Sequence, residues 1–292
     1  MSRFDFIQVA DPQFGFRDRM ARIGPQGIAS LRAGEFLGPV EPLVERPDPE
    51  EDGLAREGRH LGAALAEASR RSAKFVVVCG DMVNSILEPR ELKALRGATS
   101  ALSAHIPIYF VPGNHDTAVD YTAARPTADG LAWYREAFGE HYYSFRVDDT
   151  FFLALNSELL MDSSLVPEEG ARHFRFIEDA LSSHEARTAA QRIVFMHRPL
   201  FSGSAARDHL QVVGQPRRQE ITQLFRERGV RTVMAGHLHR NVESNDGDIE
   251  VIATAGAGYA FGGLPGFRSV AIDGETLSHT FHPIAVDPGS TD

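Results

Sequence analysis

The sequence predicts an α/β protein with two mixed β-sheets, and two observations lead to this expectation. Short apolar segments recur along the chain and indicate buried strands, while amphipathic segments between several of them indicate helices. The chain of 292 residues is 42% hydrophobic and 24% charged, which is typical of a folded globular protein. Because neither a repeat nor a clear linker interrupts it, we expect one domain over residues 1–292.

The predicted strands fall into two groups. Five apolar segments are each followed by polar residues, namely Phe4–Ala10, Phe75–Cys79, Ile106–Val111, Ile193–Met196 and Val230–Ala235. The other strands are expected in a hairpin around residues 148–149 and towards the C-terminal end, namely Tyr142–Val147, Phe151–Asn156, Ile249–Ala253, Arg268–Ile272 and Thr280–Ile284. Apolar residues spaced three and four apart predict helices around residues 54–68, 92–102, 174–181 and 221–225.

A long segment at about residues 15–52 shows no stable periodicity. Its second half, Gly38–Asp52, carries four prolines and six acidic residues. We therefore expect a Pro/acid-rich insertion, either a functional lid or a solvated surface loop.

Charge and cysteine content narrow the classes of partner and compartment. The formal net charge of −10 and the pI near 5.6 make nucleic acid and anionic membranes poor electrostatic partners. The single cysteine, Cys79, excludes an internal disulfide and permits a cytoplasmic location, which we expect. No apolar segment approaches the ~18 residues of a membrane span. Asp5 and Asp11 interrupt the apolar N-terminal stretch, which argues against a signal peptide. The oligomeric state stays open.

Metal-ligating side chains follow the five strands of the first group. In chain order they are Asp11, Gln13, Asp81, Asn114, His197, His237 and His239. Singly, each has an ordinary structural explanation, such as a turn or a buried polar residue, so the prediction depends on their conjunction. Ligands of open α/β sheets bind at the carboxyl ends of the strands. Seven oxygen and nitrogen donors exceed the about four to six that one ion needs, so we predict two ions sharing a carboxylate.

Neighbouring residues are candidates for further roles in phosphoryl chemistry. His115 could protonate a leaving oxygen, and Asp116 or Asn84 could hold its imidazole. Arg198, directly after His197, could bind phosphate in a bidentate way, although a structural ion pair explains it equally well.

The order of these motifs resembles the calcineurin-like metallophosphoesterases. The shared pattern is Asp-x-Gln, Gly-Asp, Gly-Asn-His-Asp, His and Gly-His-x-His, and it spans residues 11–239. The resemblance implies a four-layer αββα sandwich with a dinuclear metal site. It also implies a first ion on Asp11, Gln13, Asp81 and His239, and a second on Asp81, Asn114, His197 and His237. By the same resemblance, His115 is the general acid.

One departure from the common family pattern concerns the first ion. Most members have histidine where this chain has Gln13, and the variant Ala-Asp-Pro-Gln-Phe-Gly is similar to a subgroup regarded as serine/threonine protein phosphatases. A carboxamide oxygen is a weaker donor than imidazole, so manganese, iron or magnesium is favoured, with zinc as an alternative. Family position places Tyr259 and Phe261 near the mouth of the site, where they would line a substrate wall or simply pack.

The expected function is hydrolysis of phosphoesters by a metal-bridging hydroxide. A phosphomonoesterase acting on a small molecule or a phosphoprotein is the first hypothesis. A cyclic-nucleotide or other phosphodiesterase is the alternative, and a metal-binding scaffold that has lost turnover is the third. Six of the seven ligand positions retain strong donors and His115 is present, which argues against the scaffold.

Overall fold

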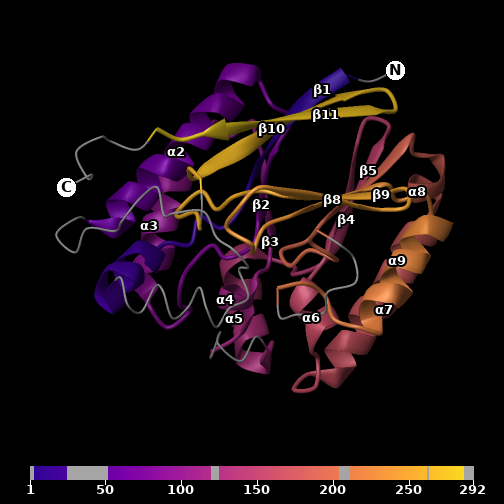
Figure 1. Cartoon of the computed structure of the whole chain (residues 1–292), viewed down its shortest axis with the longest axis horizontal. Helices are drawn as coiled ribbons and strands as arrows, with labels where there is room; N and C mark the ends of the chain where they lie inside the picture. Colours follow the sequence, from indigo (N-terminus) through magenta and orange to yellow (C-terminus); the bar gives the residue numbers. More distant parts are fainter. Residues whose placement is uncertain (1–2, 25–51, 120–124, 204–210, 262, 286–292) are drawn as a thin grey trace.

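The computed structural model describes residues 3–24, 52–119, 125–203, 211–261 and 263–285, and Figure 1 shows their arrangement. Two sheets lie face to face. The first sheet has the order β11 (Thr276–Pro283), β10 (Gly266–Asp273), β1 (Arg3–Val9), β2 (Val76–Cys79) and β3 (Ile108–Val111). Strands β1, β2 and β3 are parallel, whereas β10 is antiparallel to both of its neighbours.

The second sheet is formed by the middle of the chain. Its order is β4 (Tyr143–Val147), β5 (Thr150–Ala154), β6 (Gln191–Phe195), β7 (Thr232–Ala235), β9 (Ile249–Ala253) and β8 (Val242–Asp246). The four central strands are parallel, and the edge strands β4 and β8 are antiparallel to their neighbours.

Strand periodicity divides the core into three layers. In β1, Phe4 and Phe6 point between the sheets, whereas Ile7 and Val9 point to the outer face. Phe6 stacks on Phe75 at 4.7 Å and meets Phe152 of the second sheet edge to face at 5.7 Å. These buried aromatic pairs fill the space between the sheets with apolar side chains.

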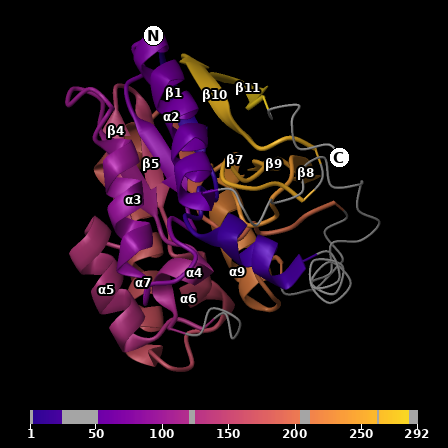
Figure 2. The same cartoon turned by 90° about the vertical axis from the view of Figure 1, so that its left-hand side faces the viewer.

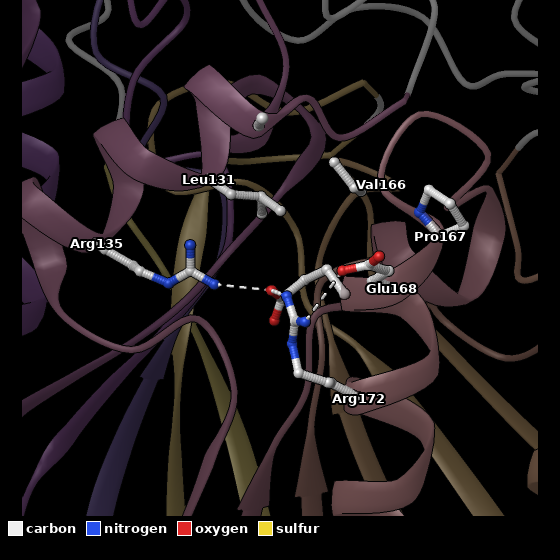
Figure 3. A pocket seen from close by; sticks show the side chains of 8 residues that line it. Leu131, Arg135, Val166, Pro167, Glu168 and Arg172 are labelled. Carbon is white, nitrogen blue, oxygen red and sulfur yellow. Dashed lines mark hydrogen bonds and ion pairs between the residues drawn. The ribbon is translucent and has the colours of Figure 1, made fainter.

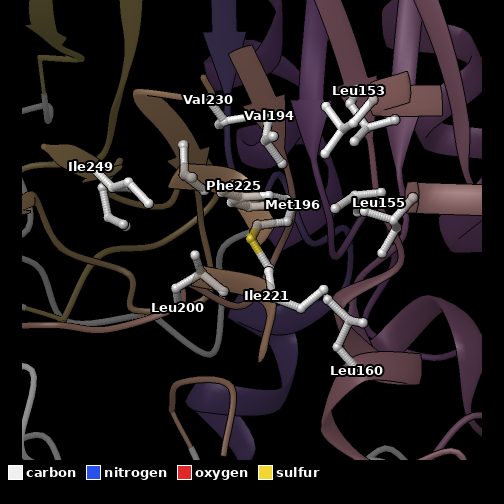
Figure 4. Packing of buried hydrophobic residues seen from close by; sticks show 14 of the residues in the cluster. Leu153, Leu155, Leu160, Val194, Met196, Leu200, Ile221, Phe225, Val230 and Ile249 are labelled. Atoms are coloured by element: carbon white, nitrogen blue, oxygen red, sulfur yellow. The ribbon is translucent and has the colours of Figure 1, made fainter. Parts of the chain in front are cut away.

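Helices cover both outer faces. Helices α2 (Gly53–Arg71) and α3 (Pro89–Thr99) pack on the first sheet, and α7 (Pro167–Ser182) and α9 (Arg217–Glu227) pack on the second (Figures 1 and 2). Figure 4 shows the second helix–sheet layer, in which Ile221 and Phe225 lie against Val194 and Met196. The other labelled helices are α4 (Asn114–Thr117), α5 (Ala128–Phe138), α6 (Ser157–Met161) and α8 (His184–Thr188), and residues 16–24 are also helical. This architecture confirms the αββα sandwich.

Local signals explain where the helices begin. The Asp52 side chain accepts a hydrogen bond from the Ala55 amide at 3.1 Å and caps α2. Helix α7 begins at Pro167, a residue whose missing amide hydrogen costs nothing in the first turn. None of the helices in the described ranges is long and apolar enough to cross a membrane.

All ten predicted strands and all four predicted helices are present, with displaced ends, but the prediction was incomplete. Strand β8 was missed because its sequence, Val-Glu-Ser-Asn-Asp, is that of a polar edge strand. Helix α5 and the short helices α4, α6 and α8 were also missed. Residues 16–24 are helical, contrary to the expected irregularity of the segment 15–52. Their buried residues Phe16 and Met20 are only one turn apart, too little for a periodic signal. Residues 25–51 lie outside the described part.

Candidate metal centre

The predicted ligands meet where the two sheets come together. Asp11, Asp81 and Asn114 follow β1, β2 and β3 of the first sheet, while His197 and His237 follow β6 and β7 of the second. Each side chain therefore projects from the carboxyl end of a parallel strand. The packing of two sheets, not of one sheet edge alone, brings the donors together.

Four donors surround one position beside His197. The Nε2 atom of His197 lies 3.1 Å from His237 Nδ1, 3.2 Å from Asn114 Oδ1 and 3.3 Å from Asp81 Oδ2. Asp81, His197 and His237 each offer a ligand atom within 4.8 Å of the others. Two imidazoles, a carboxamide oxygen and a carboxylate are a suitable donor set for a divalent transition-metal ion.

A second set of donors lies beside His239. Its Nε2 atom lies 3.4 Å from Oδ1 of Asp11, and that oxygen also lies 3.9 Å from His197 Nδ1. The Asp11 Oδ1 and Gln13 Oε1 atoms are buried and have no hydrogen-bond partner among the described residues. Buried polar atoms nearly always have a partner, so these two orphaned oxygens fit ligands of an ion.

Backbone carbonyls orient three of the imidazoles. The Nδ1 atoms of His197, His239 and His115 lie 2.7–2.9 Å from the carbonyl oxygens of Cys79, Tyr259 and Asn84. A carbonyl only accepts, so each Nδ1 is assigned as the donor and each Nε2 is turned toward the site. This arrangement is typical of metal-ligating histidines.

Burial and neighbouring charges shift the pKa values of the acidic and imidazole groups in the site. Burial raises the pKa of Asp11 to about 8, although His197 opposes the shift. Asp81 is equally buried, but His197 and His115 outweigh burial and hold its pKa below the usual range. Burial lowers the pKa of His197, but Asp81 and Asp11 outweigh it and raise that pKa to about 10. Divalent cations would favour the ionised form of both carboxyl groups.

Backbone strain is concentrated at the candidate ligands. Seven non-glycine residues in the described ranges have a positive φ, and five of them are predicted ligands: Asp11 (46°), Gln13 (38°), Asp81 (52°), His237 (67°) and His239 (50°). Such conformations cost about 1–3 kcal/mol each and cluster at functional sites. The sequence offered no direct signal of this strain.

Two glycines leave room for the ligands. A Cβ atom at Gly80, whose φ is +85°, would collide with the His197 ring. A Cβ atom at Gly113 would collide with Oδ1 of Asp81. The glycines of Gly-Asp and Gly-Asn-His-Asp thus permit close approach of the ligand side chains.

Of the two predicted partners of His115, Asn84 holds the imidazole, and it does so through its backbone carbonyl, at 2.7 Å. The Asp116 carboxylate accepts hydrogen bonds from the amides of Met82 and Gly113, at 2.9 and 2.8 Å. Asp116 therefore links the loops after β2 and β3, a contact that needs a buried acceptor and not a base.

The predicted substrate-binding residues are buried. Arg198 is 2% exposed and pairs with Glu158, the ion-pair alternative raised by the sequence. Tyr259 is fully buried, and its ring packs with Phe16 and Phe261 at centroid distances of 5.9 and 5.5 Å. Tyr259 meets the site through its carbonyl oxygen, and its ring packs between these two aromatic side chains.

Sequence reasoning missed two residues beside the site. Phe16 lies against His239 and His115, with ring centroids 5.2 and 6.4 Å away. Glu158 belongs to the polar triplet Asn156–Glu158 that follows β5, the same signal that identified the metal ligands. The signal was hidden because β5 belongs to a predicted hairpin and not to the five strands that precede the predicted ligands.

A separate cavity of about 360 Å³ lies between α5 and α7 (Figure 3). Arg135 and Arg172 both pair with Glu169, which also accepts a hydrogen bond from the Tyr142 hydroxyl at 2.9 Å. Two acidic residues, Glu168 and Glu169, balance the two arginines. The cavity therefore presents compensated charges and none of the predicted ligands.

The comparison with protein families decides the membership of the chain. The model of the calcineurin-like phosphoesterases matches residues 51–241, more than half of the sequence. The chain belongs to the calcineurin-like phosphoesterase family. It is therefore a metal-dependent phosphoesterase, a hydrolase that uses divalent metal ions. The match includes Asp81 to His239 but begins after Asp11 and Gln13.

Relatives across nearly the full length extend this family assignment. The chain is 30% identical to serine/threonine-protein phosphatase CPPED1 of Rattus norvegicus, over 96% of this chain and 84% of the relative. It is 27% identical to the protein of the same name from Danio rerio, over 96% and 85%. Both belong to the phosphatase subgroup that the Asp-Pro-Gln variant resembles.

Solved structures share the fold of this phosphoesterase at low sequence identity. A dimetal phosphatase from Danio rerio matches with a TM-score of 0.60 and 14% identity, covering 96% of both chains. Purple acid phosphatase PPD1 of yellow lupin matches with a TM-score of 0.59 and 15% identity, over 97% of this chain and 52% of the lupin chain. GAP50, the anchor in the inner membrane complex of Plasmodium, matches at 0.58 and 14%, over 97% and 85%. One fold thus serves phosphatases and an anchor, so function has to be argued from the site.

Proposed function

We propose that this chain is a phosphomonoesterase that uses two divalent ions. Asp11, Gln13, Asp81 and His239 would hold the first ion, and Asp81, Asn114, His197 and His237 the second. One observation carries this proposal: two adjacent sets of donors flank the buried carboxylates, and two of their oxygens lack a hydrogen-bond partner among the described residues. Seven donors on two sets suit two ions rather than one.

Divalent ions held at such a site would supply positive charge to a bound phosphate and a nucleophile from water near neutral pH. The contribution of the chain is geometry. The carbonyls of Cys79 and Tyr259 hold two imidazoles in place, and the main-chain strain of the ligand loops is fixed by the surrounding fold. Ions on two ligand carboxylates leave a net positive site, which favours a dianionic monoester over a monoanionic diester.

His115 is the residue that would give a proton to the leaving oxygen. Its Nδ1 atom is tied to the Asn84 carbonyl, so Nε2 faces the site, 4.0 Å from Asp81 Oδ2. Phe16 borders the ring and limits the access of water. A positioned imidazole can protonate an alkoxide as the P–O bond breaks, which matters most for leaving groups of high pKa.

The substrate class we propose is a phosphorylated serine or threonine side chain. The names of the relatives from rat and zebrafish support this proposal, as does the alkoxide leaving group that His115 would serve. A phosphodiesterase remains the competing activity, since the motif Gly-Asn-His-Asp fits both.

The deciding experiment is a substrate panel with the full-length chain. Phosphopeptides, small phosphomonoesters and 3′,5′-cyclic nucleotides would be compared by kcat/KM after loading with Mn²⁺, Mg²⁺, Fe²⁺ or Zn²⁺, and Asp81→Asn serves as the inactive control. We expect monoesters to be hydrolysed more efficiently than cyclic diesters, with phosphoserine peptides among the good substrates. A cyclic nucleotide that surpasses every monoester would contradict the proposal.

A further inference from the structure

Arg198 contacts a predicted metal ligand as well as its acidic partner. Its Nη2 atom donates to Glu158 Oε2 at 2.9 Å, and its Nε atom lies 3.3 Å from both oxygens of that carboxylate. The Nη1 atom lies 2.7 Å from Nε2 of His237. The Ser157 hydroxyl accepts from the Arg198 amide at 2.9 Å and donates to Glu158 at 3.1 Å. The guanidinium is thus held in one orientation against the His237 ring.

His237 differs in this respect from the other imidazoles of the site. His197, His239 and His115 each direct the nitrogen that faces away from the site to a backbone carbonyl, an acceptor. The corresponding nitrogen of His237 faces a cationic donor instead. Its other nitrogen, Nδ1, is the atom that meets His197 Nε2 and the rest of the second donor set.

For two physical reasons, the contact between Arg198 and His237 disfavours the binding of an ion to His237. A guanidinium has donors and no acceptor, so the contact requires Nε2 to accept and places the ring hydrogen on Nδ1, where an ion would bind. A neutral imidazole that ligates through Nδ1 instead carries its hydrogen on Nε2, which would then face the Nη1 donor. The fixed positive charge of Arg198 also repels a divalent cation on the same ring, in a site where little water screens the charges.

We propose that Arg198 is a positioning residue that opposes ion binding at His237, and that this contact opens when the second ion binds. The inference rests on the proposed two-ion function. Glu158 reduces the repulsion between Arg198 and the ion, because its carboxylate compensates the guanidinium charge. The same carboxylate holds the Arg198 side chain in place. The Glu158–Arg198 pair would therefore set how tightly the second ion is held.

Opposite effects of two variants test the proposal. The double variant Glu158→Gln/Arg198→Met removes one negative and one positive charge together, so no buried charge is left unpaired. Isothermal titration with Mn²⁺ alone should show a second ion bound about tenfold tighter or more than in the wild-type chain, because the nearer charge is the repelling one. The single variant Glu158→Gln leaves the guanidinium uncompensated and should weaken the second ion. A merely structural pair would weaken binding in both variants.

Arg268→Met is a matched control. Arg268 is also buried, and its Nη1 atom lies 3.3 Å from Glu243 Oε1 and 2.7 Å from His279 Nδ1. None of these three residues is a predicted ligand. The ion affinity of the Arg268→Met variant should equal that of the wild type. A wild-type chain that binds fewer than two ions would contradict the proposed function itself. Two ions in the wild type, with unchanged or weaker binding in the double variant, would overturn only the role of Arg198.

A crystal structure of the Mn²⁺-loaded wild-type chain tests the same inference without any substitution. The distance from Arg198 Nη1 to His237 Nε2 should lengthen beyond hydrogen-bond reach. An ion on Nδ1 with the 2.7 Å contact retained would overturn the proposal.

Discussion

His197 Nε2 and Asn114 Oδ1 lie 3.2 Å apart, although 83 residues separate them in the chain. Asn114 follows β3 of the first sheet and His197 follows β6 of the second. Neither sheet alone holds a complete set of donors for the proposed second ion. Ion binding by this chain therefore depends on how the two sheets pack against each other, as well as on the individual ligands.

Asp81→Asn should remove bound metal and activity. The amide can still accept the His115 amide hydrogen bond, which Asp81 Oδ1 now accepts at 2.9 Å, but it lacks the charge shared by the two ions. Metal content by elemental analysis should fall, and hydrolysis should drop by several orders of magnitude. The same substitution at Asp148, an exposed turn residue with a φ of 50°, is the control. An Asp81→Asn protein with normal metal content and turnover would contradict the two-ion site.

Gln13→His should raise the affinity for zinc. Gln13 is buried and its Oε1 atom lacks a hydrogen-bond partner among the described residues, so an imidazole there would add a softer donor to the first ion. We expect the wild-type chain to be most active with Mn²⁺, and the variant to shift toward Zn²⁺ in a metal-competition assay. Equal zinc affinity in both proteins would mean that Gln13 supports a ligand and is not one itself.

His115→Ala should slow substrates in proportion to how poor their leaving group is. Loss of a general acid costs about 10²- to 10⁴-fold for an alkyl phosphate and much less for a nitrophenyl phosphate, whose leaving group needs no proton. Steady-state kcat on the two substrates measures the difference. His105→Ala, at an exposed histidine outside the site, should leave both rates unchanged. Equal slowing of both substrates would assign His115 to binding or structure.

Gly113→Ala should destabilise the fold and weaken ion binding together. The added methyl group would press on the backbone amide and on the Oδ1 atom of Asp81, at an overpacking cost of about 1–3 kcal/mol. Gly97→Ala is the matched control, because Gly97 lies within α3 and an added Cβ meets nothing within 4 Å. That variant should gain about 0.5–1 kcal/mol in stability from helix propensity. Thermal unfolding and Mn²⁺ titration of both variants check the contrast.

Glu91→Gln should change how stability depends on pH. Burial raises the pKa of Glu91 to about 7 from its usual 4.5, while hydrogen bonds such as that from the Ser85 amide, at 2.8 Å, only partly oppose it. Because the folded pKa exceeds the unfolded one, its contribution to stability is full below about pH 4.5 and is lost as the pH rises through about 7.

Urea unfolding of the wild type and Glu91→Gln at several pH values measures this effect. The wild type should lose stability relative to the variant between about pH 4.5 and 7. Glu136→Gln, at an exposed glutamate of α5, should follow the wild type. Parallel curves for wild type and Glu91→Gln would show that Glu91 ionises freely in the folded chain.

Strands and ligands were predictable because their signals are local. Val76–Cys79 is a fully buried run of apolar residues, and Asp81 follows it within two positions, so both the strand and its functional end are visible in the sequence. Strand β8 was hidden because it lies at an edge and pairs with one neighbour, which leaves polar residues outward. Its existence depends on tertiary pairing rather than on composition.

The geometry of the candidate site was not predictable in the same way. The left-handed backbone of Asp81 and His239 is sparsely populated for any residue other than glycine, and the surrounding fold imposes it. The Glu158–Arg198 pair joins residues 40 positions apart that follow the neighbouring strands β5 and β6, which periodicity cannot reveal. From the sequence, an ion pair and a phosphate clamp were equal alternatives for Arg198. The structure shows the ion pair, which Arg198 forms with Glu158.

The antiparallel pairing of β1 with β10 has a consequence for synthesis of the chain. Arg3 pairs with Asp273, so the strand that precedes Asp11 borders one that is synthesised after all of the predicted ligands. Until β10 is available, that edge of β1 has no partner strand. A nascent chain exposing such an edge is prone to pair with another copy. A comparison of soluble yield after slow and fast expression would reveal whether assembly of the centre depends on the hairpin of β10 and β11.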